Sequence, residues 1–270
     1  MNYFKILCVL LLLIPMEKAS GQDFVLTQTT PIKGDVFIGV DNFGFLYTIK
    51  GSVLHKTKDL LDYNYQDILL GPIASVDLTN PLNLILFYQE ANTVVVLDNR
   101  LNEKQRLKFN EIDPFPALQM ALNAGSGRLW LMDMIDQSVW LYEVATNRIL
   151  AKTPPISGSL LTASCRFNDC LIQTDLTFVR VDNFGNLAWS LASGSYDAMT
   201  YNDHYILATK GTNLFLLSYD NGKQRENITT SQLPLNWSEN LAKGLQLTQD
   251  FLYIYDGIQL YRYTINPSNK

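Results

Sequence analysis

The chain of 270 residues has few of the side chains on which most enzyme sites depend. It contains two histidines, His55 and His204, and only three cysteines, and neither histidine lies near a cysteine in sequence. A structural zinc site needs a spaced cluster of such ligands, so the sequence carries no zinc signature. We expect each histidine to be a surface or turn residue, not a metal ligand or a general base.

The common catalytic motifs are also missing. The chain has no G-x-S-x-G nucleophile elbow, no phosphate-binding P-loop and no strand-linked G-x-G-x-x-G segment. The sequence does not exclude a Ser-His-Asp triad formed by residues that are distant along the chain. The sequence therefore predicts a non-enzymatic protein, with no catalytic residue, no cofactor and no metal.

Runs of basic residues are absent as well. The chain has 21 Lys and Arg against 26 Asp and Glu, which gives a net charge of −5. A mildly acidic protein without basic clusters attracts neither nucleic acid nor anionic lipid. Nucleic acid is therefore not an expected partner.

Only the N-terminus has a long apolar run. Lys5 precedes the run 6–16, and Ala19-Ser20-Gly21 supplies the small residues typical of a signal-peptidase site. The run is shorter than the ~20 residues that cross a bilayer. We predict a cleaved signal peptide at 1–21 and an exported, periplasmic domain at 22–270 with no membrane span. An uncleaved N-terminal membrane helix is the alternative.

Two cysteines remain after this cleavage, Cys165 and Cys170, separated by four residues. In an oxidising compartment, two cysteines that flank a short β-turn can face each other across a hairpin and form a disulfide. The alternative is a pair of free, partly buried thiols. A redox-active pair is not expected, because the spacing is longer than the C-x-x-C arrangement.

The sequence does contain a recurring strand-turn-strand block. Alternating apolar strands are separated by Asp, Asn and Gly turns, and the pentapeptide V-D-N-F-G occurs at both 40–44 and 181–185. Recurrence with a period near 40 residues, without any long helical period, is typical of a β-propeller. We predict an all-β fold, a single propeller of six four-stranded blades.

Each blade should contain strands A to D, counted outward from the central channel. In blade one we assign strand B to 36–40 and strand C to 45–49, so that the first pentapeptide follows strand B, whereas the second follows strand C of blade four. Blade six lacks an outer strand, because only five residues follow Ile265. Residues 24–29 either supply that strand and close the ring, which we favour, or form strand A of blade one.

Two segments between blades are more apolar than turns require. One contains Ile112 and Phe115 and is stiffened by two prolines; the other contains Leu235 and Trp237. Long loops on a rigid scaffold concentrate binding residues, and aromatic anchors suit protein interfaces. These four residues are our candidate partner-binding residues. Equally, Phe115 and Trp237 could fold back to cover gaps between blades.

The chain also has many Asp and Asn side chains, as in six-bladed calcium-dependent lactonases. The candidates for a calcium site in the channel are Asp77, Asn80, Asp133, Asp175 and Asp203. Most lie where turn chemistry alone would place them. A lactonase-like hydrolase is therefore the alternative function, and a carbohydrate-binding module with exposed Trp or Tyr is a third.

Residues 75–82, continuing through 85–88 to 96–99, resemble a family of exported propeller proteins of Bacteroidota. The resemblance is strongest over 70–100, and it brings no catalytic motif. It implies an accessory role in an outer-membrane assembly such as the type 9 secretion and gliding machinery. The expected function is a periplasmic scaffold that binds envelope or outer-membrane proteins.

Overall fold

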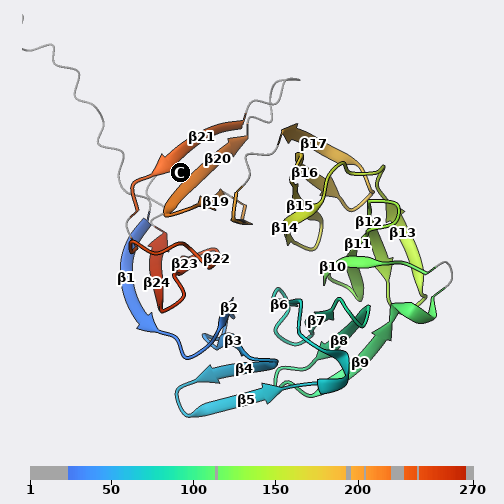
Figure 1. Cartoon of the computed structure of the whole chain (residues 1–270), viewed down its shortest axis with the longest axis horizontal. Helices are drawn as coiled ribbons and strands as arrows, with labels where there is room; N and C mark the ends of the chain where they lie inside the picture. The colour runs from blue at the N-terminus through green and yellow to red at the C-terminus, as the bar shows by residue number, and fades with distance from the viewer. Residues whose placement is uncertain are drawn as a thin grey trace, which may run out of the picture.

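The computed structural model describes residues 24–112, 115–192, 196–203, 205–219, 228–235 and 237–265. These residues form six four-stranded antiparallel sheets arranged as a ring (Figure 1). The predicted all-β, six-bladed propeller is therefore confirmed. The predicted signal peptide at 1–21 and His204 lie outside the described residues.

Five blades follow chain order from the inner to the outer strand. They are β2 (Val36–Val40), β3 (Leu46–Lys50), β4 (Val53–Lys58) and β5 (Leu61–Tyr65); β6 (Ser75–Asp77), β7 (Leu84–Tyr88), β8 (Thr93–Leu97) and β9 (Glu103–Lys108); β10 (Leu118–Asn123), β11 (Arg128–Asp133), β12 (Ser138–Glu143) and β13 (Arg148–Lys152); β14 (Leu160–Cys165), β15 (Asp169–Thr174), β16 (Thr177–Asp182) and β17 (Leu187–Ala192); β18 (Ala198–Tyr201), β19 (Ile206–Lys210), β20 (Asn213–Tyr219) and β21 (Ile228–Leu233). Two 3₁₀ turns, η1 (Ile68–Leu70) and η2 (Phe109–Glu111), lie in the connections that follow blades one and two.

The sixth blade combines the two ends of the described chain. It contains β22 (Gly244–Leu247), β23 (Phe251–Tyr255), β24 (Gln259–Ile265) and, as its outer strand, β1 (Phe24–Pro31). Strand β1 pairs antiparallel with β24, from Phe24 opposite Ile265 to Pro31 opposite Gln259. The favoured prediction of ring closure by the N-terminal strand is confirmed, and the pairing covers the edge that β24 would otherwise expose.

The predicted strand order in blade one is wrong by one position. Strand β2 is the innermost strand and pairs with β3, so 36–40 is strand A and β3 is strand B. Strands C and D are β4 and β5, which contain several polar side chains and are partly exposed. The outer strands face solvent on one side, so they lack the strong apolar alternation by which strands are recognised in sequence.

The repeated pentapeptide forms the same tight turn at two different places. Asp41 Oδ1 accepts hydrogen bonds from the N–H groups of Phe43 and Phe45, both at 2.9 Å. Asp182 does the same for the residues two and four positions later. The first copy lies between strands A and B, and the second between strands C and D. The copies are not equivalent, as predicted, although the first follows strand A and not strand B.

The core is divided among the six interfaces between neighbouring blades. Strand β7 shows the reason: Leu84 and Leu86 pack toward blade one, while Ile85 and Phe87 pack toward blade three. Successive side chains of a strand point to opposite faces, so an inner strand between two blades must be apolar on both. This explains the continuous apolar run L-I-L-F-Y in β7.

The ring has two faces, which we name by their turns. The AB face carries the A–B and C–D turns; the BC face carries the B–C turns and the connections from strand D to the next strand A. In the part of the chain that the structure describes, no helix is long and apolar enough to cross a membrane.

Candidate partner-binding site

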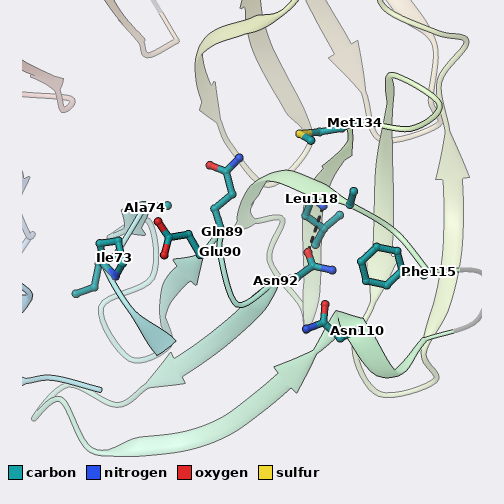
Figure 2. Close-up of a pocket in the computed structure, with 11 residues that line it drawn as sticks. Ile73, Ala74, Gln89, Glu90, Asn92, Asn110, Phe115, Leu118 and Met134 are labelled. Atoms are coloured by element: carbon teal, nitrogen blue, oxygen red, sulfur yellow. Dashed lines mark hydrogen bonds between the residues drawn. The ribbon is translucent and has the colours of Figure 1, made fainter. Parts of the chain in front are cut away.

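A pocket of about 600 Å³ lies on the BC face between blades two and three (Figure 2). This volume is within the range of ligand-binding pockets. One wall comes from blade two and the connection that precedes it, the other from Asn110, Phe115 and Ala117 of the next connection and from blade three. The lining residues are Pro72, Ile73, Ala74, Gln89, Glu90, Asn92, Asn110, Phe115, Ala117, Leu118 and Met134.

Asn92 holds the two walls together. Its Nδ2 donates to the carbonyl oxygen of Pro116 at 2.7 Å, and its Oδ1 accepts from the N–H of Leu118 at 3.2 Å. Asn92 is buried and has a φ of 48°, a left-handed conformation that asparagine tolerates better than most residues. One side chain thus satisfies two backbone groups of the neighbouring connection and fixes its position.

Asp133 fixes the same connection from blade three. Its Oδ1 accepts from the N–H of Ala117 at 2.8 Å and from that of Ile135 at 3.3 Å. The N–H of Met134 in turn donates to the carbonyl oxygen of Ala117 at 2.8 Å. The pocket walls are therefore held by hydrogen bonds within the described chain, before any ligand binds.

The pocket combines an apolar rim with a small polar group. Phe115 is 51% exposed and Met134 is 45% exposed, although both are large apolar side chains. In the chain segments next to the lining residues Pro72 and Met134, Ile68, Leu69 and Ile135 are also strongly exposed. Clustered apolar exposure on a soluble surface marks interaction sites, whereas single exposed residues are ordinary. The polar lining consists of the exposed side chains of Gln89, Glu90 and Asn110 together with buried Asn92.

The four predicted partner-binding residues lie in different places. Phe115 lines the pocket with its ring exposed, and Ile112 packs half-buried against the core between blades two and three. Leu235 and Trp237 are only 5% and 6% exposed and belong to the core between blades five and six. Trp237 therefore folds back to cover a gap between blades, which was the alternative expectation for it. Neither Leu235 nor Trp237 is a surface anchor in this structure.

Sequence reasoning missed most of the pocket. Glu90 and Asn92 lie in the B–C turn of blade two, where turn chemistry alone explains an acid and an asparagine, and no motif in the sequence distinguishes Ile68, Leu69 or Met134. The run Ile68-Leu69-Leu70 outside any predicted strand was the available signal. No sequence pattern indicates that this run, the turn at 90–92 and Phe115 lie on one face.

The two cysteines face each other across the hairpin of β14 and β15. Cys165 and Cys170 are paired residues of the ladder, with 4.0 Å between their Cα atoms, and their sulfur atoms are joined as a disulfide. The intervening A–B turn contacts both neighbouring blades: the Arg166 carbonyl accepts from Trp130 Nε1 at 2.7 Å, and its guanidinium pairs with Asp203. The disulfide thus holds a turn at the channel mouth of the AB face.

The structure does not bring the candidate calcium ligands together. They are spread over four blades, with only Asp77 and Asn80 in the same blade, and the described residues contain no group of three or more His, Cys, Asp or Glu side chains arranged for a metal. Asp77 accepts from the N–H groups of Thr79 and Asn123 at 2.7 and 2.8 Å. Burial raises the pKa of Asp77, and these hydrogen bonds act in the opposite direction. Asp77 therefore ties blade two to blade three.

The central channel at the AB face is lined by both polar and apolar side chains, and the polar ones include Asp41, Arg166 and Thr200. A cavity of about 520 Å³ is lined by aliphatic side chains of several inner strands, among them Ile38, Val76, Leu122 and Leu245. His55 lies on β4, with Nδ1 3.7 Å from an Asp62 carboxylate oxygen. This places His55 on strand C of an outer hairpin, in keeping with a surface role.

No protein-family model matches the chain, and no curated protein matches it in sequence. Among solved structures, it is similar to virginiamycin B lyase from Staphylococcus aureus, with a TM-score of 0.62 and 10% identity over 90% of this chain and 100% of that one. It is also similar to the β-propeller domain of Cps50 (Swd1) from Myceliophteria thermophila, with a TM-score of 0.60 and 10% identity over 90% and 100% of the two chains.

A chain of the mitotic checkpoint complex is similar as well, with a TM-score of 0.60 and 12% identity over 84% of this chain and 73% of that one. These neighbours include a lyase and a chain taken from a multiprotein complex. At such identities the likeness shows the propeller fold alone, because one fold supports many unrelated functions.

Proposed function

We propose that this protein is a non-enzymatic scaffold that binds other proteins through the pocket on its BC face. The observation that carries the proposal is the exposure of Phe115 and Met134 beside walls fixed by Asn92 and Asp133. Exposed apolar anchors on a rigid frame bind with little loss of conformational entropy, which is how preorganised interfaces gain affinity.

The polar side chains of the turns support a structural role for the acidic residues. Asp41 and Asp182 accept backbone hydrogen bonds in their own turns, Asp133 accepts one from the connection that precedes its blade, and Asp77 joins two blades. Such side chains satisfy the backbone of a propeller and need no catalytic function to explain them. This supports a scaffold over the lactonase-like alternative.

We further propose that the partners are envelope or outer-membrane proteins, and that the protein is an accessory subunit of an outer-membrane secretion assembly of the type 9 kind. The signal-like N-terminus and the resemblance of residues 70–100 to exported Bacteroidota propellers support this location.

Affinity purification from the native cell envelope tests the proposal. A tag placed after Ile265 lies at the AB face, because β24 ends there, and leaves the BC face free. Reversible crosslinking before extraction should capture a reproducible partner with the wild-type protein. Phe115→Ser combined with Met134→Ser should reduce the captured amount about tenfold or more, since each loses a buried apolar contact in the complex.

Phe184→Ser is the matched control. Phe184 is 77% exposed and lies in a C–D turn of the AB face, so its loss removes a similar apolar surface from the other side of the ring. Equal loss of partner in both variants would show that the BC face is not the binding surface. Purification of the wild-type protein without any reproducible partner would contradict the scaffold function itself.

A further inference from the structure

Glu90 is an isolated acid in the lining of the pocket. Its side chain is exposed, and within the described residues its carboxylate takes part in no hydrogen bond or ion pair. Figure 2 shows Glu90 on the wall formed by blade two, beside Ile73 and Ala74. Among the residues that the structure describes, it is the only charged one that lines the pocket.

Two cations on β9 of the same blade are engaged with other acids. Arg106 pairs with Asp67 and Glu103, both at 2.7 Å. Lys108 pairs with Glu111 at 3.2 Å, on the connection that forms the opposite wall. The described surroundings of Glu90 therefore offer it no free positive charge, and the pocket presents one uncompensated negative charge to a ligand.

An apolar ridge adjoins this acid. The 3₁₀ turn η1 exposes Ile68 by 79% and Leu69 by 94%. Asp67 caps the turn by accepting from the N–H of Leu69 at 2.9 Å, and its other carboxylate oxygen bonds Arg106, so the two aliphatic side chains are held outward. A Cβ built on Gly71, which ends the turn, would lie 3.3 Å from Glu90 Oε2. Glu90 thus lies directly beside η1.

The order of groups across the surface is therefore aliphatic, acidic and aromatic: η1, then Glu90, then Phe115 with Met134. We infer that the occupant is an extended segment of a partner protein in which a Lys or Arg side chain is flanked by apolar side chains. The basic group pairs with Glu90, and the apolar neighbours pack on Leu69 and Phe115. This inference rests on the proposed scaffold function and specifies the chemistry of its ligand.

A lysine or arginine suits this arrangement for a physical reason beyond its charge. Its aliphatic stem can lie along the apolar wall while the charged end reaches the carboxylate. A charge-assisted hydrogen bond of this kind is stronger than a neutral one and becomes stronger when the ligand excludes water. An acidic segment would instead meet the uncompensated charge of Glu90 and be rejected.

Panning of a random peptide library displayed on phage tests this inference with the whole folded protein. Immobilisation through a tag after Ile265 exposes the BC face. We expect enriched peptides to carry Lys or Arg next to Leu, Ile, Met or Phe. For a synthetic form of the best peptide, fluorescence anisotropy should show that Glu90→Gln weakens binding about tenfold, while replacement of the peptide's basic residue by norleucine has little additional effect in that variant.

Glu239→Gln is the control, because Glu239 is an exposed acid on the connection between blades five and six and does not line the pocket. It should leave the affinity unchanged. Leu69→Ser should weaken the same peptide without changing its preference for a basic residue.

Three outcomes would overturn the inference: enrichment of no peptide, enrichment of neutral or acidic peptides, or equal binding by wild type and Glu90→Gln. If envelope partners are still lost in the Phe115 and Met134 double variant, the scaffold proposal survives that result. If partners are not captured at all, the scaffold proposal fails independently of the peptide chemistry.

Discussion

Gln246 joins blade six to blade one, and its removal should weaken the closure of the ring. Its Oε1 accepts from the N–H of Val40 at 2.7 Å, and its Nε2 donates to the carbonyl oxygen of the same residue at 2.9 Å. A Cβ on Gly39 would come within 3.0 Å of Gln246 Nε2, so the glycine leaves room for the amide. The Gln246 side chain thus bonds both the N–H and the carbonyl oxygen of Val40, the last residue of β2.

The cost of Gln246→Ala can be worked out from this geometry. Each net hydrogen bond contributes about 1 kcal/mol, and Val40 is only half-buried, so water can replace part of what is lost. We expect a decrease of about 2 kcal/mol in the free energy of unfolding. For a domain of this size that corresponds to a fall in Tm of roughly 4–8 °C.

The effect should be visible because this interface has a small apolar core, although the Tyr255 hydroxyl also donates to the Gly34 carbonyl oxygen there at 3.1 Å. The buried cluster between blades six and one contains Phe37, Tyr253, Tyr255 and Leu260, and it is the smallest of the interface clusters in the described chain. Thermal unfolding followed by circular dichroism measures the shift. Gln105→Ala is the control, since Gln105 is an exposed residue of an outer strand and should lower Tm by no more than about 2 °C.

A second variant tests the donor role separately. In Gln246→Glu the ionised carboxylate can accept from Val40 but cannot donate to its carbonyl, so folding should favour the protonated acid and raise its pKa. A raised pKa stabilises the fold below the unfolded value of about 4.3, and this stabilisation is lost as pH rises. The difference in the free energy of unfolding between wild type and Gln246→Glu should therefore become smaller as the pH is lowered. Equal Tm values for Gln246→Ala and Gln105→Ala, or a pH-independent deficit for Gln246→Glu, would refute the reasoning.

Three other expectations concern two buried tyrosines, the disulfide and Asn92. The hydroxyl of fully buried Tyr88 has no hydrogen-bond partner in the described residues, and burial raises its pKa to about 12, so the native state should lose stability as pH rises above about 10. Tyr88→Phe should gain about 1 kcal/mol and be less sensitive to alkali, whereas Tyr47→Phe should lose about 2 kcal/mol with its bond to Asp41, as measured by urea unfolding at pH 7 and 10.5. The disulfide closes a short loop, so replacing both cysteines by serine should cost about 2 kcal/mol, and alkylation without reductant should label neither thiol in wild type. Asn92→Gly permits the positive φ but removes both bonds to the pocket wall, so it should cost about 2 kcal/mol and weaken peptide binding; unchanged binding would show that Asn92 does not shape the pocket.

Much of the fold could be predicted from local patterns. The apolar runs of β7 and β8 are buried on both faces, which the sequence shows as continuous Leu, Ile and Val. The closing strand β1 was predictable from a missing partner, because blade six has three strands and an edge in need of cover. The strand order of blade one was wrong because β4 and β5 contain so many polar residues that their sequences resemble loops.

The site was far less predictable. Phe115 was recognised because two prolines flank it in sequence, while Trp237 gave an equally strong signal and is buried. An aromatic residue in a connection looks the same in sequence whether it packs under the next blade or projects from the surface. Glu90 gave no signal, since an acid in a tight turn is ordinary.

The sequence by itself determined the repeat, the period and therefore the number of blades, because strand alternation and turn chemistry are local and act within about 40 residues. Only the tertiary structure decided which apolar residues are exposed and which acids lack partners. Those properties depend on contacts between η1, the turn at 90–92 and the described residues 109–112 and 115–117, which are separate segments of the chain. Local sequence patterns do not encode how such segments meet, so the pocket and its isolated Glu90 become visible only in the closed ring.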